Sequence, residues 1–250
     1  MKVLHELDGN ELMEIRDIQE TQKKLHLPIS PLAFIDLEVL NNNGVIKQKY
    51  SDRSKSWVRN MYNFITGVHL GVGPGNMGGT TYGEGTLVMR SITGSNINTA
   101  NSSVISARDS QTGVNRFRHF RGDTGSVTMG IVLGSSDKEE DFDDFKLDTL
   151  IGHGSGSGQL VYNSMPSMVP LWSSLERKMI CHVTRVFTNS SGGLVSVKEM
   201  GIYCSVYTGI ANQTIQSQIM ISRDKLSSIV EVGSGETLNV RYSIEIPFPG

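Results

Sequence analysis

Strict alternation in the segment TLNVRYSIEI, residues 237–246, most constrains the fold of this chain. Apolar side chains alternate there with polar ones at Leu238, Val240, Tyr242, Ile244 and Ile246. Because successive side chains of a strand point to opposite faces, this pattern predicts a long strand with one face in a core and one in water. Shorter strand-like segments recur from residue 87 onward, separated by Gly, Ser and Asn turns. We therefore expect a mainly β chain, with a β-sandwich or jelly-roll-like domain over residues 87–250.

The length of 250 residues is common for one all-β domain with an attached arm. The 23 basic and 25 acidic residues give a net charge of −2, which argues against a protein that wraps nucleic acid. No apolar run reaches the roughly 18 residues of a membrane span, and the first residues lack the apolar core of a secretion signal. We expect synthesis in a cytoplasm and no membrane partner.

Cys181 and Cys204 lie in strand-like runs, which favours buried thiols over a disulfide.

Residues 1–50 are expected to form an N-terminal arm that contains a helix and a hairpin. Apolar residues at three- and four-residue steps before Pro28 indicate an amphipathic helix with a narrow stripe. Such a stripe buries little surface alone, so the helix docks either on another subunit or on its own domain. FIDLEVL and VIKQKY flank the sequence NNNG, in which Gly44 suits a positive φ, and this predicts a hairpin. The helix contributes four interface candidates: Leu12, Ile15, Ile18 and Leu25.

Residues 51–86 are expected to form a second amphipathic helix and a Gly-rich loop. Ser51 or Asp52 would cap a helix whose Trp57 and Met61 share one side, a stripe that predicts a core contact rather than a cofactor site. The loop GVGPGNMGGTTYGEG satisfies G-x-G-x-x-G, but a dinucleotide site needs a strand before this motif, and here a helix precedes it. GHGSGSG, which follows later, has neither the Lys-Ser/Thr of a P-loop nor the central serine of a hydrolase elbow.

NRFRHFR, residues 115–121, is a basic segment interleaved with aromatic residues. This segment could bind the phosphate backbone of a nucleic acid. On a weakly acidic chain we favour a protein interface, where Arg and aromatic side chains are the usual anchors. The six histidines show no H-E-x-x-H and no Cys/His zinc spacing, so we expect no metal site, no cofactor and no catalytic residues. The segment contributes five interface candidates: Arg116, Phe117, Arg118, Phe120 and Arg121.

The acidic loop, residues 137–148, contains seven carboxylates and two lysines in the sequence DKEEDFDDFKLD. An EF-hand calcium loop needs Gly at its sixth position, and that position is Phe142. A general acid needs a carboxyl group in a dry cleft, whereas these acids share a short polar segment. We expect a solvated turn, or one that faces a basic neighbour such as residues 115–121. Whether the loop binds a cation stays open.

Several segments, taken in order, resemble a family of tailed-bacteriophage virion proteins. They are DRSKSWVRNMYNFI; GIVLGSS, DDFKLDTLI and GQLVY; VTRVFTNSSGGLVSVKEMGIYC; and ISRDKL with VEVGSGETLNVRYSIEIPF. The similarity is scattered over residues 51–248, and DKEEDFDD is inserted where that family usually has a short turn. The resemblance implies a β-sandwich subunit of the head, neck or tail that assembles with copies of itself and with other virion proteins. It implies no catalytic residues.

A structural component of the virion, made in the host cytoplasm, is therefore the expected function. The alternative is a receptor- or glycan-binding adhesin on the virion surface, whose exposed loops, such as residues 71–85, hold the ligand. A hydrolase that uses His153 or Asp143 is a third possibility, although no local motif points to it.

Overall fold

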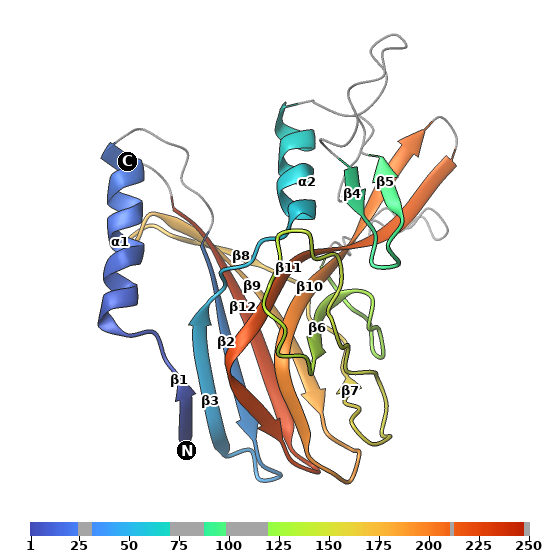
Figure 1. Cartoon of the computed structure of the whole chain (residues 1–250). Helices are drawn as coiled ribbons and strands as arrows, with labels where there is room; N and C mark the ends of the chain where they lie inside the picture. The colour runs from blue at the N-terminus through green and yellow to red at the C-terminus, as the bar shows by residue number, and fades with distance from the viewer. Residues whose placement is uncertain (25–31, 71–87, 99–119, 211–212, 248–250) are drawn as a thin grey trace. The chain divides into compact units, whose positions relative to one another are not determined.

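The computed structural model describes residues 1–24, 32–70, 88–98, 120–210 and 213–247 (Figure 1). Strands account for 50% of the chain and helices for 11%, so the prediction of a mainly β chain is confirmed. The chain forms two compact units, each built from segments that are separate in the sequence. Unit 1 comprises Met1–Lys55, Gly154–Ser196 and Ser227–Gly250, and unit 2 comprises Ser56–His153 and Val197–Leu226.

The main element of unit 1 is a seven-stranded sheet with the order β1, β3, β2, β12, β9, β7, in which β8 also pairs with β9. Its strands are β1 (Lys2–His5), β2 (Leu32–Leu40), β3 (Ile46–Arg53), β7 (Val161–Tyr162), β8 (Pro170–Ser173), β9 (Lys178–Thr188) and β12 (Thr237–Pro247). β1 runs parallel to β3, and the other pairs are antiparallel. The helix α1 (Gly9–Lys24) follows β1 and confirms the predicted N-terminal helix.

β12 lies between β2 and β9 because its alternating side chains match an apolar row on β2 and a buried row on β9, in which Arg185 stands between Val183 and Phe187. Leu238, Val240 and Tyr242 are buried, and Val240 stands opposite Leu37 of β2 and Arg185 of β9. Burying each apolar side chain of this size contributes roughly 1.5–3 kcal/mol. The predicted alternation of a buried and a solvent-facing side is found over residues 237–242 and is lost beyond them, where Ser243 is buried and Ile246 is 46% exposed.

The hairpin predicted from NNNG is confirmed as β2 and β3. Gly44 has a φ of 75°, and its N–H donates to the carbonyl oxygen of Asn41 at 2.9 Å. The side chain of Asn41 accepts the N–H groups of Asn43 and Val45. The hairpin is part of the sheet of unit 1, since β2 pairs with β12 along its whole length.

The second helix begins later than expected. α2 spans Arg59–Leu70, so the predicted caps Ser51 and Asp52 are wrong, because both belong to β3. Asp52 stands opposite Ile35 in the β2–β3 ladder. Strand pairing therefore overrides the local preference of Ser and Asp for helix caps.

Unit 2 contains α2, a two-stranded sheet and parts of a three-stranded sheet. β4 (Val88–Arg90) pairs with β5 (Asn96–Asn98), and the larger sheet has the order β11, β10, β6. Its strands are β6 (Gly130–Gly134), β10 (Val195–Ile210) and β11 (Gln213–Val232). Two of the strand-like segments after residue 87, IQSQIMIS and IVEV, belong to the single strand β11. Cys204 is a buried free thiol, as expected, and Cys181 on β9 is a half-buried one.

Asn60 joins the start of α2 to two strands of unit 2. Its side-chain amide donates to the carbonyl oxygens of Arg90 on β4 and Met220 on β11, at 2.8 and 3.0 Å. Its Oδ1 accepts the N–H of Arg90 at 2.7 Å. One buried amide thus satisfies backbone groups of both strands, which explains a polar residue at this position.

Glu236 closes the turn between β11 and β12 in unit 1. Its carboxylate accepts the N–H of Gly233 at 2.8 Å and contacts the ammonium of Lys47 on β3. Burial opposes the charge of Glu236, but the contacts with Lys47 and Gly233 outweigh it and lower the pKa below its ordinary value of 4.5. A lowered pKa stabilises the fold above the unfolded-state value, and this contribution is lost as pH falls through the folded-state value.

We expect Glu236→Gln to lower the free energy of unfolding by about 1 kcal/mol at neutral pH, because the amide cannot form the ion pair with Lys47. The difference from wild type should shrink below pH 4.5, as the wild-type carboxyl group becomes protonated. Urea unfolding at neutral and acidic pH measures this difference in the free energy of unfolding. Glu231→Gln, at an exposed position of β11, is the control, and equal pH profiles for the two variants would contradict this role of Glu236.

Candidate functional site

The acidic loop folds around a buried arginine of β11 in unit 2. The side chain of Arg223 is fully buried. Its Nη1 donates to Oδ2 of Asp144 at 2.6 Å, and its Nε donates to Oε2 of Glu199 at 2.8 Å. The carbonyl oxygens of Glu139 and Lys138 accept further N–H groups at 3.0 and 2.9 Å. The loop therefore supplies one carboxylate and two carbonyl groups to a single guanidinium.

Glu199 of β10 completes this cluster beside β6. Its side chain is fully buried and, besides Arg223, accepts the N–H groups of Asp148 and Thr149. Glu199 stands opposite Gly134, the last residue of β6, and a Cβ at that glycine would clash with the Glu199 carboxylate. Glycine at the end of GIVLG is therefore required for the carboxylate to fit.

The remaining carboxylates of the acidic loop also meet groups of the chain. Ion pairs join Asp137 to Lys198, Glu139 to Lys225, Asp143 to Arg59 and Asp148 to Lys138. Glu140 accepts the N–H of Lys225, and Asp141 accepts the N–H of Asp143. The expectation of a solvated turn is wrong for the inner side of the loop, where Asp144 is 13% exposed, and holds only for outer residues such as Asp137, which is 79% exposed. Arg223 was missed because nothing in its local sequence, ISRDKL, marks it as a partner of these acids.

The electrostatics of this cluster are those of a structural element. Burial opposes the charge of Arg223, but its hydrogen bonds to Glu199 and Asp144 outweigh burial and raise the guanidinium pKa. A hydrogen bond from Ser136 is the main reason why the pKa of Asp148 is lowered. Both groups therefore keep their ordinary charges at neutral pH, unlike groups that are poised to transfer a proton.

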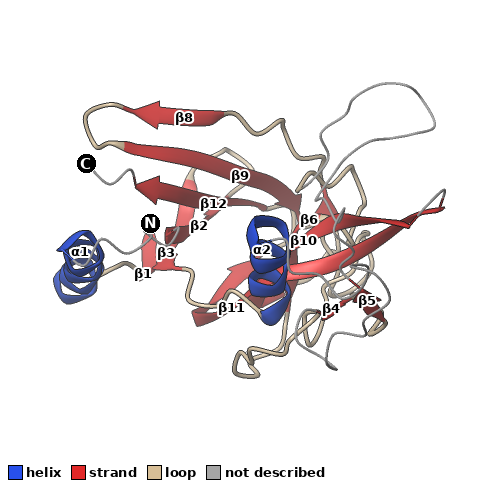
Figure 2. Ribbon diagram, turned by 90° about the horizontal axis from the view of Figure 1, so that it is seen from above, coloured by secondary structure: helices blue, strands red, loops and turns tan. Residues whose placement is uncertain are grey.

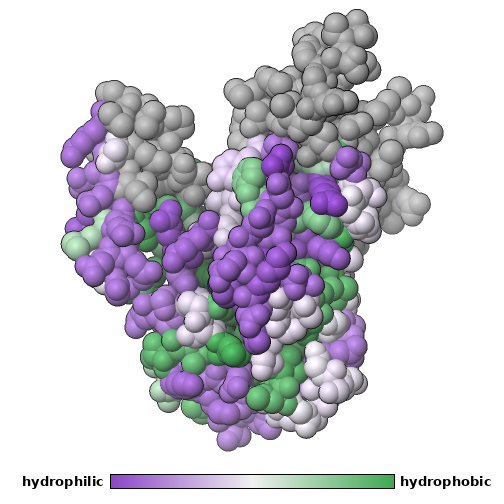
Figure 3. All heavy atoms as spheres, viewed as in Figure 1, coloured by the Kyte–Doolittle hydropathy of each residue, from purple (hydrophilic) through white to green (hydrophobic). Residues whose placement is uncertain are grey.

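The predicted interface residues of α1 differ in exposure. Leu12 is 52% exposed, whereas Ile15 is 8% exposed and contributes to the core. The side chain of Ile18 and the whole of Leu25 lie outside the described residues. The surface of α1 is mostly hydrophilic (Figure 3). Of the two candidates whose side chains are described, Leu12 is therefore the one that remains accessible to a partner.

The predicted interface residues of the basic segment are only partly described. Arg116, Phe117 and Arg118 lie outside the described residues, and Phe120 and Arg121 are half-buried. The described basic neighbours of the acidic loop lie instead on α2, β10 and β11. An interface role for the basic segment stays a prediction.

Sequence reasoning missed a group of exposed apolar side chains at one end of the sheet in unit 1. Trp172 of β8, Met179 of β9 and Ile246 of β12 stand opposite one another in register and are 56%, 42% and 46% exposed. Residues in register on neighbouring strands share a face of the sheet, so the three form one row. Leu171 is 53% exposed, and Leu175 between β8 and β9 is 93% exposed. We call these five residues the hairpin surface; Figure 2 shows β8, β9 and β12 side by side.

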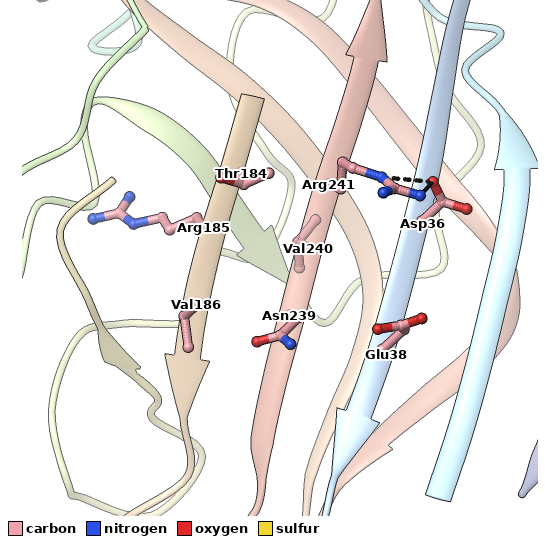
Figure 4. Close-up of a pocket in the computed structure, with 8 residues that line it drawn as sticks. All are labelled: Asp36, Glu38, Thr184, Arg185, Val186, Asn239, Val240 and Arg241. Carbon is pink, nitrogen blue, oxygen red and sulfur yellow. Dashed lines mark hydrogen bonds and ion pairs between the residues drawn. The ribbon is translucent and has the colours of Figure 1, made fainter. Parts of the chain in front are cut away.

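The solvent-facing side of the same sheet has a hollow of about 330 Å³ (Figure 4). Two cross-strand rows line it, Asp36, Arg241 and Thr184 in one and Glu38, Asn239 and Val186 in the other. Arg241 donates from Nε and Nη2 to Oδ2 of Asp36 at 3.1 and 2.8 Å. The hollow therefore offers carboxylate, amide, hydroxyl and guanidinium groups on three adjacent strands.

Comparison of the chain with protein-family models, curated proteins and solved structures finds no match. Among the described helices, none is long and apolar enough to cross a membrane. These comparisons therefore assign the chain to no family.

Two neighbouring aspartates test whether Arg223 fixes the acidic loop. Asp144→Asn removes the charge that faces Arg223 and should lower the free energy of unfolding by about 1.5–3 kcal/mol. Asp143→Asn removes the same charge at a position that is 60% exposed and paired with Arg59, and should cost about 0.5 kcal/mol or less. Urea unfolding of both variants measures the difference. Small, equal costs would indicate a solvated loop.

Proposed function

We propose that this chain is a structural subunit of a tailed-phage virion, a head decoration, neck or tail component that works by self-assembly and by contact with other virion proteins. The hairpin surface is the observation that supports this proposal most. The ordered segments that resemble tailed-phage virion proteins support the type of particle. A β-sandwich or jelly-roll-like arrangement of the sheets belongs to the same proposal, as does the absence of an enzymatic role.

The hairpin surface has the properties of a protein interface. Trp172, Met179 and Ile246 form one apolar row on a face of the sheet, and each is at least 42% exposed. Leu171, which is 53% exposed, points to the opposite face. Contiguous apolar side chains on a surface typically mark an interaction site. Tryptophan is among the residues that most often anchor such a site. We therefore place a protein partner on the β8–β9 hairpin.

A second copy of the chain is the partner that fits this hairpin best. β8 pairs with β9 on one side, and none of the described strands pairs with its other side. An open antiparallel edge is complementary to its own copy about a two-fold axis, because both present the same N–H and C=O groups. Pairing of this kind would bring the two Trp172 rows together and bury them.

The hollow on the solvent-facing side favours the alternative, a receptor- or glycan-binding adhesin on the virion surface. Glu38 and Asn239 stand opposite each other there and offer hydrogen-bond groups that suit sugar hydroxyls. Residues 71–85, which the sequence suggested for this role, lie outside the described residues.

A glycan array probed with the assembled protein separates the alternative from the main proposal. Binding that is lost in Asn239→Ala and kept in Asn43→Ala, an exposed Asn of the β2–β3 turn, would favour the adhesin. Absence of binding would count against it.

We expect Trp172→Ser to weaken self-assembly at least tenfold, because truncation of an anchoring tryptophan costs about 2 kcal/mol or more. Analytical ultracentrifugation over a range of concentrations measures the dissociation constant. Leu194→Ser is the matched control, since Leu194 is an equally exposed apolar residue, 58%, in the turn between β9 and β10. It should leave assembly unchanged.

Two results would contradict the proposed function. A wild-type chain that stays monomeric, alone and when mixed with other virion proteins, would exclude self-assembly. An antibody against the chain should label the head, neck or tail of purified particles in electron micrographs, and particles without label would exclude the virion role.

A further inference from the structure

Three side chains with metal-binding atoms meet close to the N-terminus in unit 1. His5 ends β1, Glu11 lies in the first turn of α1, and Asp52 lies near the end of β3. One ligand atom from each lies within 4.8 Å of the other two. Among the described residues, no other three His, Cys, Asp or Glu side chains meet this closely.

Strand pairing and a helix cap hold these side chains in place. β1 pairs with β3 so that His5 stands opposite Tyr50, two residues before Asp52. Oδ1 of Asp8 accepts the N–H of Glu11 at 2.9 Å, and Oε2 of Glu11 accepts the N–H of Asp8 at 3.1 Å. This reciprocal pair is a capping box, which fixes the first turn of α1.

Asp52 is oriented by contacts on both of its oxygens. Its side chain is 9% exposed. Oδ1 accepts the N–H of Arg53 at 2.7 Å, and Oδ2 accepts the hydroxyl of Tyr50 at 2.8 Å. Carboxylates that bind metals are typically held by outer hydrogen bonds of this kind.

His5 provides an observation that is independent of the two carboxylates. Its Nε2 is shielded from solvent and makes no hydrogen bond, although buried polar atoms almost always have a partner. This nitrogen lies 3.5 Å from Oδ2 of Asp52. Two ligands of a tetrahedral zinc ion, with bonds of about 2 Å, lie roughly 3.3 Å apart. The imidazole and the carboxylate already have this separation.

Lys55 indicates that the cluster attracts a positive charge. Its Nζ lies 3.8 Å from Glu11 and 4.0 Å from Asp52, distances at which ion pairs are weak. The Lys55 side chain is 63% exposed, so it can turn into solvent when a doubly charged ion takes its place.

The geometry points to a divalent transition-metal site formed by His5, Glu11 and Asp52, with Tyr50 as a positioning residue and Lys55 as a competing cation. One nitrogen and two oxygen ligands suit Zn²⁺ and related ions and leave a coordination position for water. The ion joins β1 and the start of α1 to β3. This inference is independent of the proposed function, and it differs from the expectation of no metal site, which rested on short sequence motifs.

Titration of the tag-free, chelator-treated full chain with Zn²⁺ in a calorimeter tests the site. We expect saturable binding by the wild type, with a rise in melting temperature. His5→Ala should weaken binding on the order of 100-fold or more, because loss of an outer contact alone costs about 10- to 100-fold. Tyr50→Phe should weaken it about tenfold or more. Lys55→Ala should strengthen it, because the competing ammonium is gone.

His153→Ala is the matched control, since His153 is an exposed histidine of unit 2, and it should bind Zn²⁺ like the wild type. Equal weakening by His5→Ala and His153→Ala would overturn the site. So would the absence of saturable binding by both the wild type and Lys55→Ala, which would leave an ordinary ion-pair cluster. Circular dichroism checks that His5→Ala folds; if it does not, tighter binding by Lys55→Ala supports the site and unchanged or weaker binding overturns it.

Discussion

The structure of unit 2 depends on the ion pairs and hydrogen bonds of one buried group, the guanidinium of Arg223. A charge moved from water into a protein interior costs several kcal/mol unless partners with good geometry surround it. Arg223 has such partners in Glu199, Asp144 and two carbonyl groups of the acidic loop. The loop must close for the charge to be buried, and β6 must end in Gly134 for Glu199 to fit. β6, β10, β11 and the loop therefore stabilise one another through a single cluster.

Much of unit 1 could be predicted from the sequence, because the local pattern and the tertiary environment agree there. The alternating segment 237–246 forms most of β12, which pairs with a strand on each side. The sequence NNNG forms the β2–β3 turn, and the helical spacing of apolar residues before Pro28 corresponds to α1. The start of α2 was missed because Asp52 has the preferences of a helix cap, while its pairing in β3 decides its conformation. Local preference fails where a distant strand competes for the same backbone groups.

The candidate sites could not be predicted because each joins residues that are distant in the sequence. The acidic loop was visible as a run of carboxylates, but its partner Arg223 lies on another element without a local signal. His5 and Asp52 likewise meet only because β1 pairs with β3. The apolar residues around Trp172 suit a core strand as well as an edge strand. Only the strand order places β8 where its side chains stay exposed.

The inner face of the sheet in unit 1 changes from core to surface along β12. Its inward side chains are buried as far as Tyr242, Ile244 is half-buried, and Ile246 is 46% exposed. Trp172 and Met179 lie beside Ile246 in register, so the apolar face continues beyond the part that the chain covers. The contact between copies that we propose would extend a hydrophobic core across them, as in obligate assemblies, whose interfaces resemble a domain core cut in half. Such exposed apolar side chains suit a protein that acts in assembled form, because association of the copies removes these side chains from water. A chain that acts alone would have to keep the same surface in solvent, so the exposed row argues for assembly in either role.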